Sequence, residues 1–213
     1  MRDRLLDGAQ QLVLERGFAA TTVDAVLSAT GTSKGAFFHH FATKNELARA
    51  LVERYAAADL EHLEAFMAAA EAATSDPAEQ LVAFVSLFEE AADDLAREQP
   101  GCLYVSFVYE KQLVEDGTNE LIVDAVIGWR TRLAEKIEAA ITTHPPQIEV
   151  DVTSLADLVF TTFEGGFILA RTLRDPSLLR GQLAHLRQYL ELLFAVGAAA
   201  PTTNGFELGA ESP

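Results

Sequence analysis

The chain has 213 residues, of which 49% are apolar, and Cys102 is its single cysteine. This length can bury a substantial core in one or two domains, whereas one cysteine excludes an internal disulfide, so we expect a soluble cytoplasmic protein. Residues 1–31 carry charges throughout and lack the apolar segment of a secretory signal. No apolar run is long enough for us to expect a membrane span or a membrane partner.

Charge is distributed unequally along the chain. The formal net charge is −16, but residues 1–50 hold six Lys and Arg against five Asp and Glu, whereas residues 51–213 hold ten against 27. A near-neutral head therefore precedes a strongly acidic body. The acidic body argues against a nonspecific polyanion-binding protein, but it leaves room for a small head that contacts phosphate groups locally.

Two helices are predicted at the start of the head. Residues 3–16 place apolar side chains at a spacing of three to four, which indicates an amphipathic helix. Either Thr21 or Thr22 can accept a backbone N–H bond at the start of a second helix, at about 22–29. Gly31 follows, where a left-handed residue ends a helix most easily.

Two more helices follow in quick succession. Ser33 can cap a short helix at about 33–40. Thr43 and Glu46 have the spacing of a capping box, in which each side chain bonds the backbone of the other residue. The helix that they open meets no breaking residue until about residue 73.

Five further helices are predicted in the body, some with clear start signals. Asp76 and Asp151 can cap two of them. The predicted ranges are 77–98, 102–115, 119–142, 152–174 and 177–196. The chain is therefore predicted to be all-α, with nine helices and two domains: 1–45 as a helix-turn-helix head, 46–196 as a helical body, and 197–213 as a loose tail.

The stretch from Thr22 to Phe41 has the plan of a helix-turn-helix, in which the second helix enters the DNA major groove. Around it, residues 2–50 resemble the N-terminal domain of the TetR family of bacterial transcriptional regulators. The resemblance rests on Gly17-Phe18, Thr21-Thr22-Val23, Gly31-Thr32-Ser33-Lys34-Gly35-Ala36-Phe37-Phe38-His39-His40-Phe41, Lys44, Glu46 and Leu47. Pro100-Gly101-Cys102-Leu103 and Glu164-Gly165-Gly166 also look like segments of many members.

The resemblance implies a DNA-contacting surface on the head. Phe37 and Phe41 are four residues apart and are expected to face inward, whereas the remaining side chains face outward. The small Gly35 and Ala36 let the helix approach base edges. Many relatives carry tyrosine at the position of Phe38, so a phosphate-binding hydroxyl is missing here. The expected DNA-binding residues are Thr21, Thr22, Ser33, Lys34, Gly35, Ala36, Phe38, His39, His40 and Lys44.

The adjacent histidines have other interpretations. A metal site needs ligands on one face, but neighbouring helical residues point about 100° apart, and no further His or Cys is near in the sequence. His39 and His40 are therefore interpreted as nucleic-acid surface, with a metal site and plain solvated or packed histidines as the alternatives. We expect no metal and no cofactor.

The resemblance also implies a homodimer, because in this family the last two helices pair with their copies. Leucines recur at 4-3-4-3 spacing in 177–196, and the outer side of 152–174 is expected to join them. The alternative is that the leucine stripe packs only inside one subunit. The expected interface residues are Leu158, Thr162, Leu169, Leu179, Leu183, Leu186, Leu190 and Leu193.

A ligand pocket is expected in the body, where bulky rings with a few polar groups recur over several helices. Glu164 either pairs with Arg130 or Arg171 or reaches into this pocket, and the adjacent glycines suggest close approach by a neighbour or ligand. Cys102 is either a thiol sensor or a buried, inert residue. The expected lining residues are Phe66, Phe84, Phe88, Tyr104, Phe107, Trp129, Phe163, Glu164 and Phe167.

The function implied by the resemblance is a ligand-responsive regulator, most simply a dimeric repressor that a small apolar or amphipathic effector releases from a palindromic double-stranded operator. An enzyme is not expected, because His62, His144 and His185 have no recognisable nucleophile or metal partner. The other alternative is a helical ligand carrier or interaction protein that does not bind DNA.

Overall fold

The computed structural model describes residues 1–98, 101–110 and 117–197. Three short helices form the head: α1 (Arg2–Arg16), α2 (Val23–Thr30) and α3 (Lys34–His40). Thr22, not Thr21, caps α2 by accepting the Ala25 N–H at 3.1 Å, and Ser33 caps α3 by accepting the Ala36 N–H at 3.2 Å. The predicted head is confirmed, including the left-handed residue Gly31 at the end of α2 (φ 61°).

The long helix α4 (Lys44–Ala73) joins the head to the body. Thr43 accepts the Glu46 N–H at 3.1 Å, as predicted. The Glu46 carboxylate reaches one residue further back than a capping box requires, since it accepts the Ala42 N–H at 2.8 Å. The N-terminal half of α4 belongs to the head's core through residues 47–52, so head packing extends beyond residue 45.

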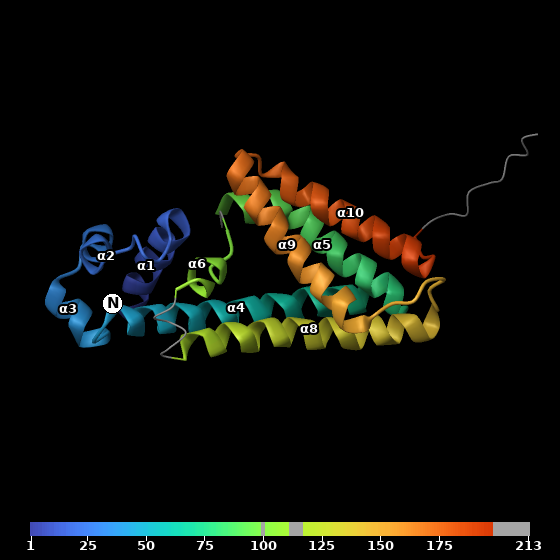
Figure 1. The fold of residues 1–213 in the computed structure, drawn as a ribbon, viewed down its shortest axis with the longest axis horizontal. Coiled ribbons are helices and arrows are strands. Elements are labelled where there is room, and N and C mark those ends of the chain that lie inside the picture. Colours follow the sequence, from blue (N-terminus) through green and yellow to red (C-terminus); the bar gives the residue numbers. More distant parts are fainter. Residues whose placement is uncertain (99–100, 111–116, 198–213) are drawn as a thin grey trace, which may run out of the picture.

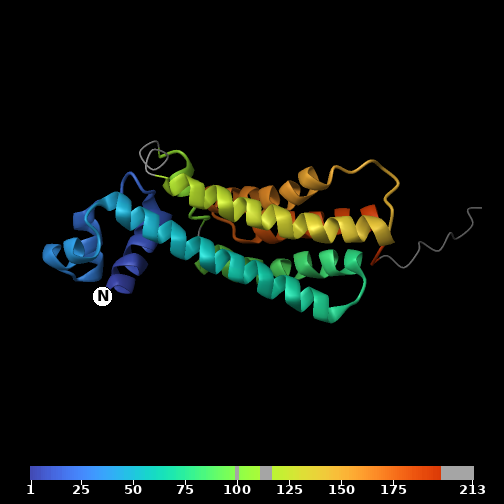
Figure 2. The same ribbon diagram turned by 90° about the horizontal axis from the view of Figure 1, so that it is seen from below.

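The body consists of α4 with α5 (Pro77–Glu98), α8 (Thr118–Thr143), α9 (Val152–Leu173) and α10 (Ser177–Phe194). Figure 1 shows the head at one end of the molecule and α4 and α8 running side by side along the body. Figure 2 shows the same pair from below. The architecture is all-α in the described residues, and the five body helices enclose one apolar core.

The helix predicted at 102–115 is wrong over its described part. Only a single turn, α6 (Val105–Val108), is helical there, and residues 111–116 lie outside the described residues. The segment instead folds against the head, where Phe107 is buried with its ring centroid 5.1 Å from that of Phe18. Packing of bulky side chains against Phe18 and against Tyr55 of α4 therefore determines this segment, in place of helical periodicity.

The leucine stripe of α10 is also placed differently from the prediction. Leu179, Leu183 and Leu190 are fully buried within the subunit, and Leu186 and Leu193 are 4% and 9% exposed, because α10 packs on α5 and α9. The five leucines are core residues, so their assignment to a dimer interface is wrong. Gly166 of α9 permits this packing, since a Cβ there would lie 2.6 Å from Leu179 Cδ1.

α9 differs from the expectation that no segment has the length and apolarity of a membrane span. Among the described residues, it is the helix long and apolar enough to cross a membrane by length and composition, a criterion that core helices of soluble proteins also meet. One side of α9 is buried against α8 and α10, and the other side exposes Leu158, Ile168, Leu169 and Leu173.

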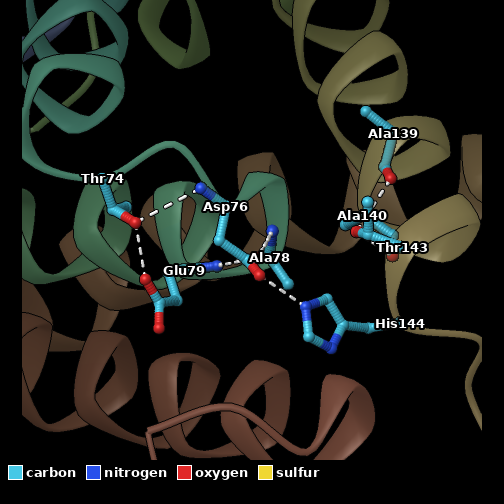
Figure 3. Close-up of polar contacts among 8 residues, drawn as sticks. All are labelled: Thr74, Asp76, Ala78, Glu79, Ala139, Ala140, Thr143 and His144. Atoms are coloured by element: carbon cyan, nitrogen blue, oxygen red, sulfur yellow. Dashed lines mark hydrogen bonds and ion pairs between the residues drawn. The ribbon is translucent and has the colours of Figure 1, made fainter.

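The end of the body far from the head is fastened by polar contacts (Figure 3). Asp76 caps α5, since its Oδ1 accepts the N–H groups of Ala78 at 2.8 Å and Glu79 at 3.2 Å. Its Oδ2 lies 2.6 Å from Nε2 of His144, at the end of α8. The predicted cap is confirmed, and it also ties the α4–α5 loop to α8.

Candidate DNA-binding surface and ligand pocket

The recognition helix α3 has one buried and one exposed face. Phe37 and Phe41 are 0% and 2% exposed, and their rings pack in the head's core. Phe38 is 47% exposed, His39 is exposed and His40 is half-buried. The predicted inward and outward faces of this helix are therefore confirmed. Lys34 adds a positive charge to the outer face, with its Nζ 6.0 Å from the centroid of the Phe38 ring.

Gly35 lies on the exposed part of α3, and the head itself does not require a glycine there. A Cβ at this position would meet only Ser33 Oγ, at 4.0 Å, and the backbone is not in the left-handed region. Glycine inside a helix lowers helix stability by about 1 kcal/mol relative to alanine. Its presence favours close approach of another molecule to this surface.

Two of the expected DNA-contacting side chains have partners inside the head. Thr21 is 2% exposed and its hydroxyl donates to the Gly17 carbonyl at 2.9 Å, so its assignment to the outer surface is wrong. Lys44 Nζ donates to the Phe18 carbonyl at 2.7 Å and lies 3.9 Å from the Phe18 ring centroid. Burial lowers the pKa of Lys44, and the nearby Glu110 carboxylate opposes that shift. Two of its three N–H groups remain for a phosphate.

The body contains a cavity of about 260 Å³. Seven of the nine expected residues line it: Phe66, Phe88, Tyr104, Trp129, Phe163, Glu164 and Phe167. Phe84 and Phe107 are the two errors. Phe84 is fully buried behind Phe88 and Trp129, and Phe107 packs against Phe18 in the head.

Sequence reasoning missed six lining residues: Tyr55, Asp59, His62, Leu95, Cys102 and Phe160. A signal for three of them exists, because Tyr55, Asp59, His62 and Phe66 follow a 4-3-4 spacing on α4 and share one helix face. Polar residues interrupt that face, so it does not read as core. The same helix that leaves the head at Lys44 thus forms one wall of the cavity.

Two carboxyl groups face the cavity. Oδ2 of Asp59 accepts hydrogen bonds from the Tyr104 hydroxyl at 3.0 Å and from Trp129 Nε1 at 2.9 Å. Burial raises the pKa of Asp59, and these two hydrogen bonds oppose the shift. Burial also raises the pKa of Glu164, and a hydrogen bond with Cys102 opposes that shift. Its Oε2 is shielded from solvent and has no hydrogen-bond partner among the described residues.

The two arginines considered as partners for Glu164 bind elsewhere. Arg130 forms a two-pronged pair with Asp157, at 2.7 and 3.0 Å. Arg171 donates to the backbone carbonyls of Leu14 and Glu15, at the end of α1. The pocket alternative for Glu164 is therefore the one that the structure supports.

Cys102 is buried beside Glu164, and burial raises the pKa of its thiol well above the usual value. A thiol held neutral is a poor nucleophile, which favours the inert interpretation.

The rings of His39 and His40 are 5.1 Å apart, and within the described ranges no three His, Cys, Asp or Glu side chains are grouped as metal ligands.

The fold and the two surfaces define a class: a helix-turn-helix DNA-binding protein with a helical body that encloses a cavity. Residues 5–51 match the tetR family of bacterial regulatory proteins, and residues 77–186 match the tetracyclin repressor-like C-terminal domain. The chain belongs to the TetR family and is a DNA-binding transcriptional regulator.

Known proteins agree with this assignment over most of the chain. The transcriptional regulator AcuR of Cereibacter sphaeroides is 25% identical over 170 residues, which cover 78% of this chain and 74% of AcuR. Reduced NemR of Escherichia coli superposes with a TM-score of 0.68 at 22% identity, over 88% of this chain and 96% of NemR. A TetR regulator from Chloroflexus aurantiacus superposes with a TM-score of 0.70 at 27% identity, over 89% of this chain and 93% of that protein.

Proposed function

We propose that the chain is a cytoplasmic, homodimeric, non-enzymatic repressor that binds a palindromic operator and is released by a small amphipathic ligand. The observation that carries this proposal is the continuity of α4. The helix starts at Lys44, beside the recognition helix, and its residues from Tyr55 to Phe66 line the cavity. A ligand that displaces α4 therefore acts on the head through one rigid element.

The outer face of α3 is the proposed base-reading surface. Gly35 and Ala36 allow the backbone to approach base edges in the major groove, and Phe38 and His39 flank them. The hydroxyls of Thr22 and Ser33 accept backbone N–H groups and keep their own protons to donate to phosphate oxygens. Phosphate contacts from Lys34, His40 and Lys44 complete the surface.

A second copy of the chain is the proposed occupant of the exposed side of α9. Leu158 and Leu169 are 41% and 40% exposed, and Leu173 is 63% exposed at the end of the same helix. The hydroxyl of Thr162 donates to the Leu158 carbonyl at 2.7 Å. Covering this face with a second subunit therefore does not leave the Thr162 hydroxyl proton without an acceptor. A twofold dimer places two heads on successive major grooves, roughly 34–36 Å apart or a multiple of that.

Two connections carry the displacement of α4 to the head. Phe107 follows the cavity residue Tyr104 in the chain and packs on Phe18. Lys44 contacts the same residue through the Phe18 carbonyl and ring. Movement of α4 or of the 101–108 segment therefore reorients the Phe18 region, which precedes α2. Release requires that the ligand bind the DNA-incompetent spacing of the heads more tightly than the DNA-competent one.

Selection of genomic fragments by the purified full-length protein, followed by gel-shift titration at several salt concentrations, tests this function. The expected result is a specific complex of two chains on a palindrome, with affinity that falls steeply with salt. A carrier without DNA binding would give no fragment enriched above the nonspecific background, and that result would overturn the proposal.

A further inference from the structure

The walls of the cavity are mainly aromatic. The Phe66 and Phe88 rings stack with centroids 4.2 Å apart, and the Phe163 ring meets Phe88 edge-on at 4.7 Å. The Trp129 ring centroid lies 6.1 Å from that of Phe88 and 6.0 Å from that of Phe163. Aromatic walls suit a ligand with an apolar body, and they also attract cations through the negative faces of the rings.

Among the described lining residues, no Lys or Arg matches the two carboxyl groups of the cavity. Among the described residues, Asp59 receives hydrogen bonds from the neutral donors Tyr104 and Trp129. The Glu164 carboxyl group has a hydrogen bond with the Cys102 thiol, and its Oε2 atom receives none. The two arginines considered above as partners for Glu164 form their hydrogen bonds elsewhere. Arg130 binds Asp157, and Arg171 binds the Leu14 carbonyl of α1. His62 is the one basic side chain among the described lining residues, and its charge interaction with Asp59 lowers the pKa of that carboxyl group.

A buried acceptor without a donor is costly, and a buried carboxylate without a cation is more so. Proteins usually remove such a group or give it a partner. Here two carboxyl groups border the same apolar cavity, and the interaction between them raises the pKa of Glu164 further. The missing partner is thus a positively charged hydrogen-bond donor that enters the cavity from outside.

We propose that the cavity binds a small arylalkyl ammonium compound, whose ring packs among Phe66, Phe88, Phe163 and Trp129 while its N–H groups donate to the Glu164 carboxyl group and face Asp59. This inference rests on the proposed function, because it names the chemical class of the effector that would occupy the same cavity. The cavity volume of about 260 Å³ restricts the ligand to a compact molecule of one or two rings. The acidic body adds long-range attraction for a cation.

Three probes of nearly equal shape isolate the effect of charge: 3-phenylpropylammonium, 3-phenylpropan-1-ol and 3-phenylpropanoate. Trp129 is the single tryptophan of the chain and lies in the cavity, so its fluorescence reports occupancy of this site directly. Calorimetry on the full-length protein supplies the dissociation constants. We expect the ammonium to bind at least tenfold more tightly than the alcohol and the carboxylate to bind most weakly.

Variants then assign the preference to the carboxyl groups. Glu164→Gln is expected to reduce the preference for the ammonium over the alcohol to less than threefold, with affinity for the alcohol unchanged. Asp157→Asn is the matched control on the same helix, since Asp157 pairs with Arg130 and does not line the cavity. It should leave the preference intact.

The inference is overturned if the alcohol or the carboxylate binds as tightly as the ammonium, if no ammonium binding is detected at millimolar concentration, or if Glu164→Gln keeps the full preference. The comparison of probes on the unchanged protein decides the matter even if Glu164→Gln fails to fold. Because these measurements contain no DNA, they separate the two proposals. Selective ammonium binding without operator release would contradict the proposed function alone, and release by anionic or neutral ligands only would contradict this inference alone.

Discussion

The Arg171 guanidinium, near the end of α9, donates to the Leu14 carbonyl at 2.6 Å, and its second terminal nitrogen donates to the Glu15 carbonyl at 2.8 Å. These carbonyls are among the last of α1, where a helix leaves its acceptors without internal partners. The body thus holds the head by a charged cap as well as through α4. Since α9 also lines the cavity with Phe163 and Glu164, this cap offers a second route from the proposed ligand to the head.

Arg171→Ala should weaken that route more than it weakens the fold. Loss of two partly exposed hydrogen bonds is expected to cost about 1–2 kcal/mol of the free energy of unfolding. Hydrogen exchange of the α1 amides should become faster while exchange in α10 stays the same. Arg171→Lys is the control, because it retains the charge but cannot reproduce the two-pronged geometry and should give an intermediate effect. Unchanged exchange in α1 for both variants would contradict the role of this cap.

Gly35→Ala should separate folding from DNA binding. The new methyl group has space in the head, so we expect the free energy of unfolding to rise by about 0.5–1 kcal/mol while operator affinity falls. Gly181→Ala is the matched control, since it is a helical glycine of α10 with nothing within 4 Å of its Cβ position. It should stabilise similarly without changing affinity. Thermal unfolding and gel-shift titration measure the two quantities, and unaltered operator affinity of Gly35→Ala would remove the argument for close backbone approach.

Lys34→Gln and Lys44→Gln should differ in stability although both weaken DNA binding. Each substitution removes one phosphate contact per subunit, so the slope of log affinity against log salt should decrease by about 1.8 for a dimer. Only Lys44→Gln should also destabilise the head, by about 1–2 kcal/mol, because Lys44 contacts the Phe18 carbonyl and ring. Arg97→Gln, an exposed residue of α5, is the control with an unchanged slope. A full slope in Lys44→Gln would show that its amine serves only the head.

Substitutions on the exposed face of α9, the proposed dimer face, should have a different effect from a substitution among the buried leucines of α10. Leu158→Glu or Leu169→Glu should give folded monomers in sedimentation experiments, because a charge on an exposed apolar face is harmless until a partner must cover it. Ile148→Glu, in the loop before α9, is the control that should remain dimeric. Leu183→Ala should instead lower the free energy of unfolding by about 2–5 kcal/mol, as in a tightly packed core. Dimers that persist in both α9 variants would exclude this helix from the interface.

The contact between Asp76 and His144 predicts a pH-dependent contribution to stability. The hydrogen bond from His144 and those from Ala78 and Glu79 lower the pKa of Asp76 in the folded protein. The folded state therefore binds this proton less readily than the unfolded state does. The contribution is complete above the unfolded pKa of about 3.9 and disappears as the pH falls through the lower folded value.

Urea unfolding of the protein and of Asp76→Asn between pH 7 and 2.5 measures this contribution. Asparagine caps a helix as well as aspartate does, so the variant should lose only the charge-assisted part of these hydrogen bonds. It should therefore be less stable than the unchanged protein at pH 7, and the difference should shrink toward zero at the acid end. A double-mutant cycle with His144→Gln isolates the pair itself. A difference that stays constant down to pH 2.5 would show that the charge of Asp76 contributes nothing.

The head was predictable because its signals are local. A hydroxyl three residues before a helical N–H, as in Thr22, Ser33 and Thr43, can cap the helix without help from distant parts of the chain, and the structure contains all three caps. Thr21 was misplaced because two adjacent threonines offer the same hydroxyl, and only the turn after Gly17 decides which one faces inward.

The body was less predictable because its decisive contacts are between helices. Phe84 and Phe88 lie one turn apart on α5, yet of the two only Phe88 borders the cavity. Which of them does so depends on where Trp129 of α8 and Phe66 of α4 lie. An amphipathic stripe such as the leucines of α10 has the same sequence pattern whether its partner is in the same chain or in another. Asp59 escaped notice because a lone acid on a helix normally faces solvent.

The internal position of Leu179, Leu183, Leu186, Leu190 and Leu193 has a consequence for gene control. Because these leucines complete the body's core within one chain, we expect the single subunit to fold without a partner. Dilution then produces intact single subunits with one DNA-reading head each, in place of unfolded chains. In the proposed dimer, operator affinity depends on two heads acting together, so promoter occupancy should vary with roughly the square of the intracellular concentration below the dimer dissociation constant. The cell's expression level of this regulator thereby becomes a control input alongside the effector.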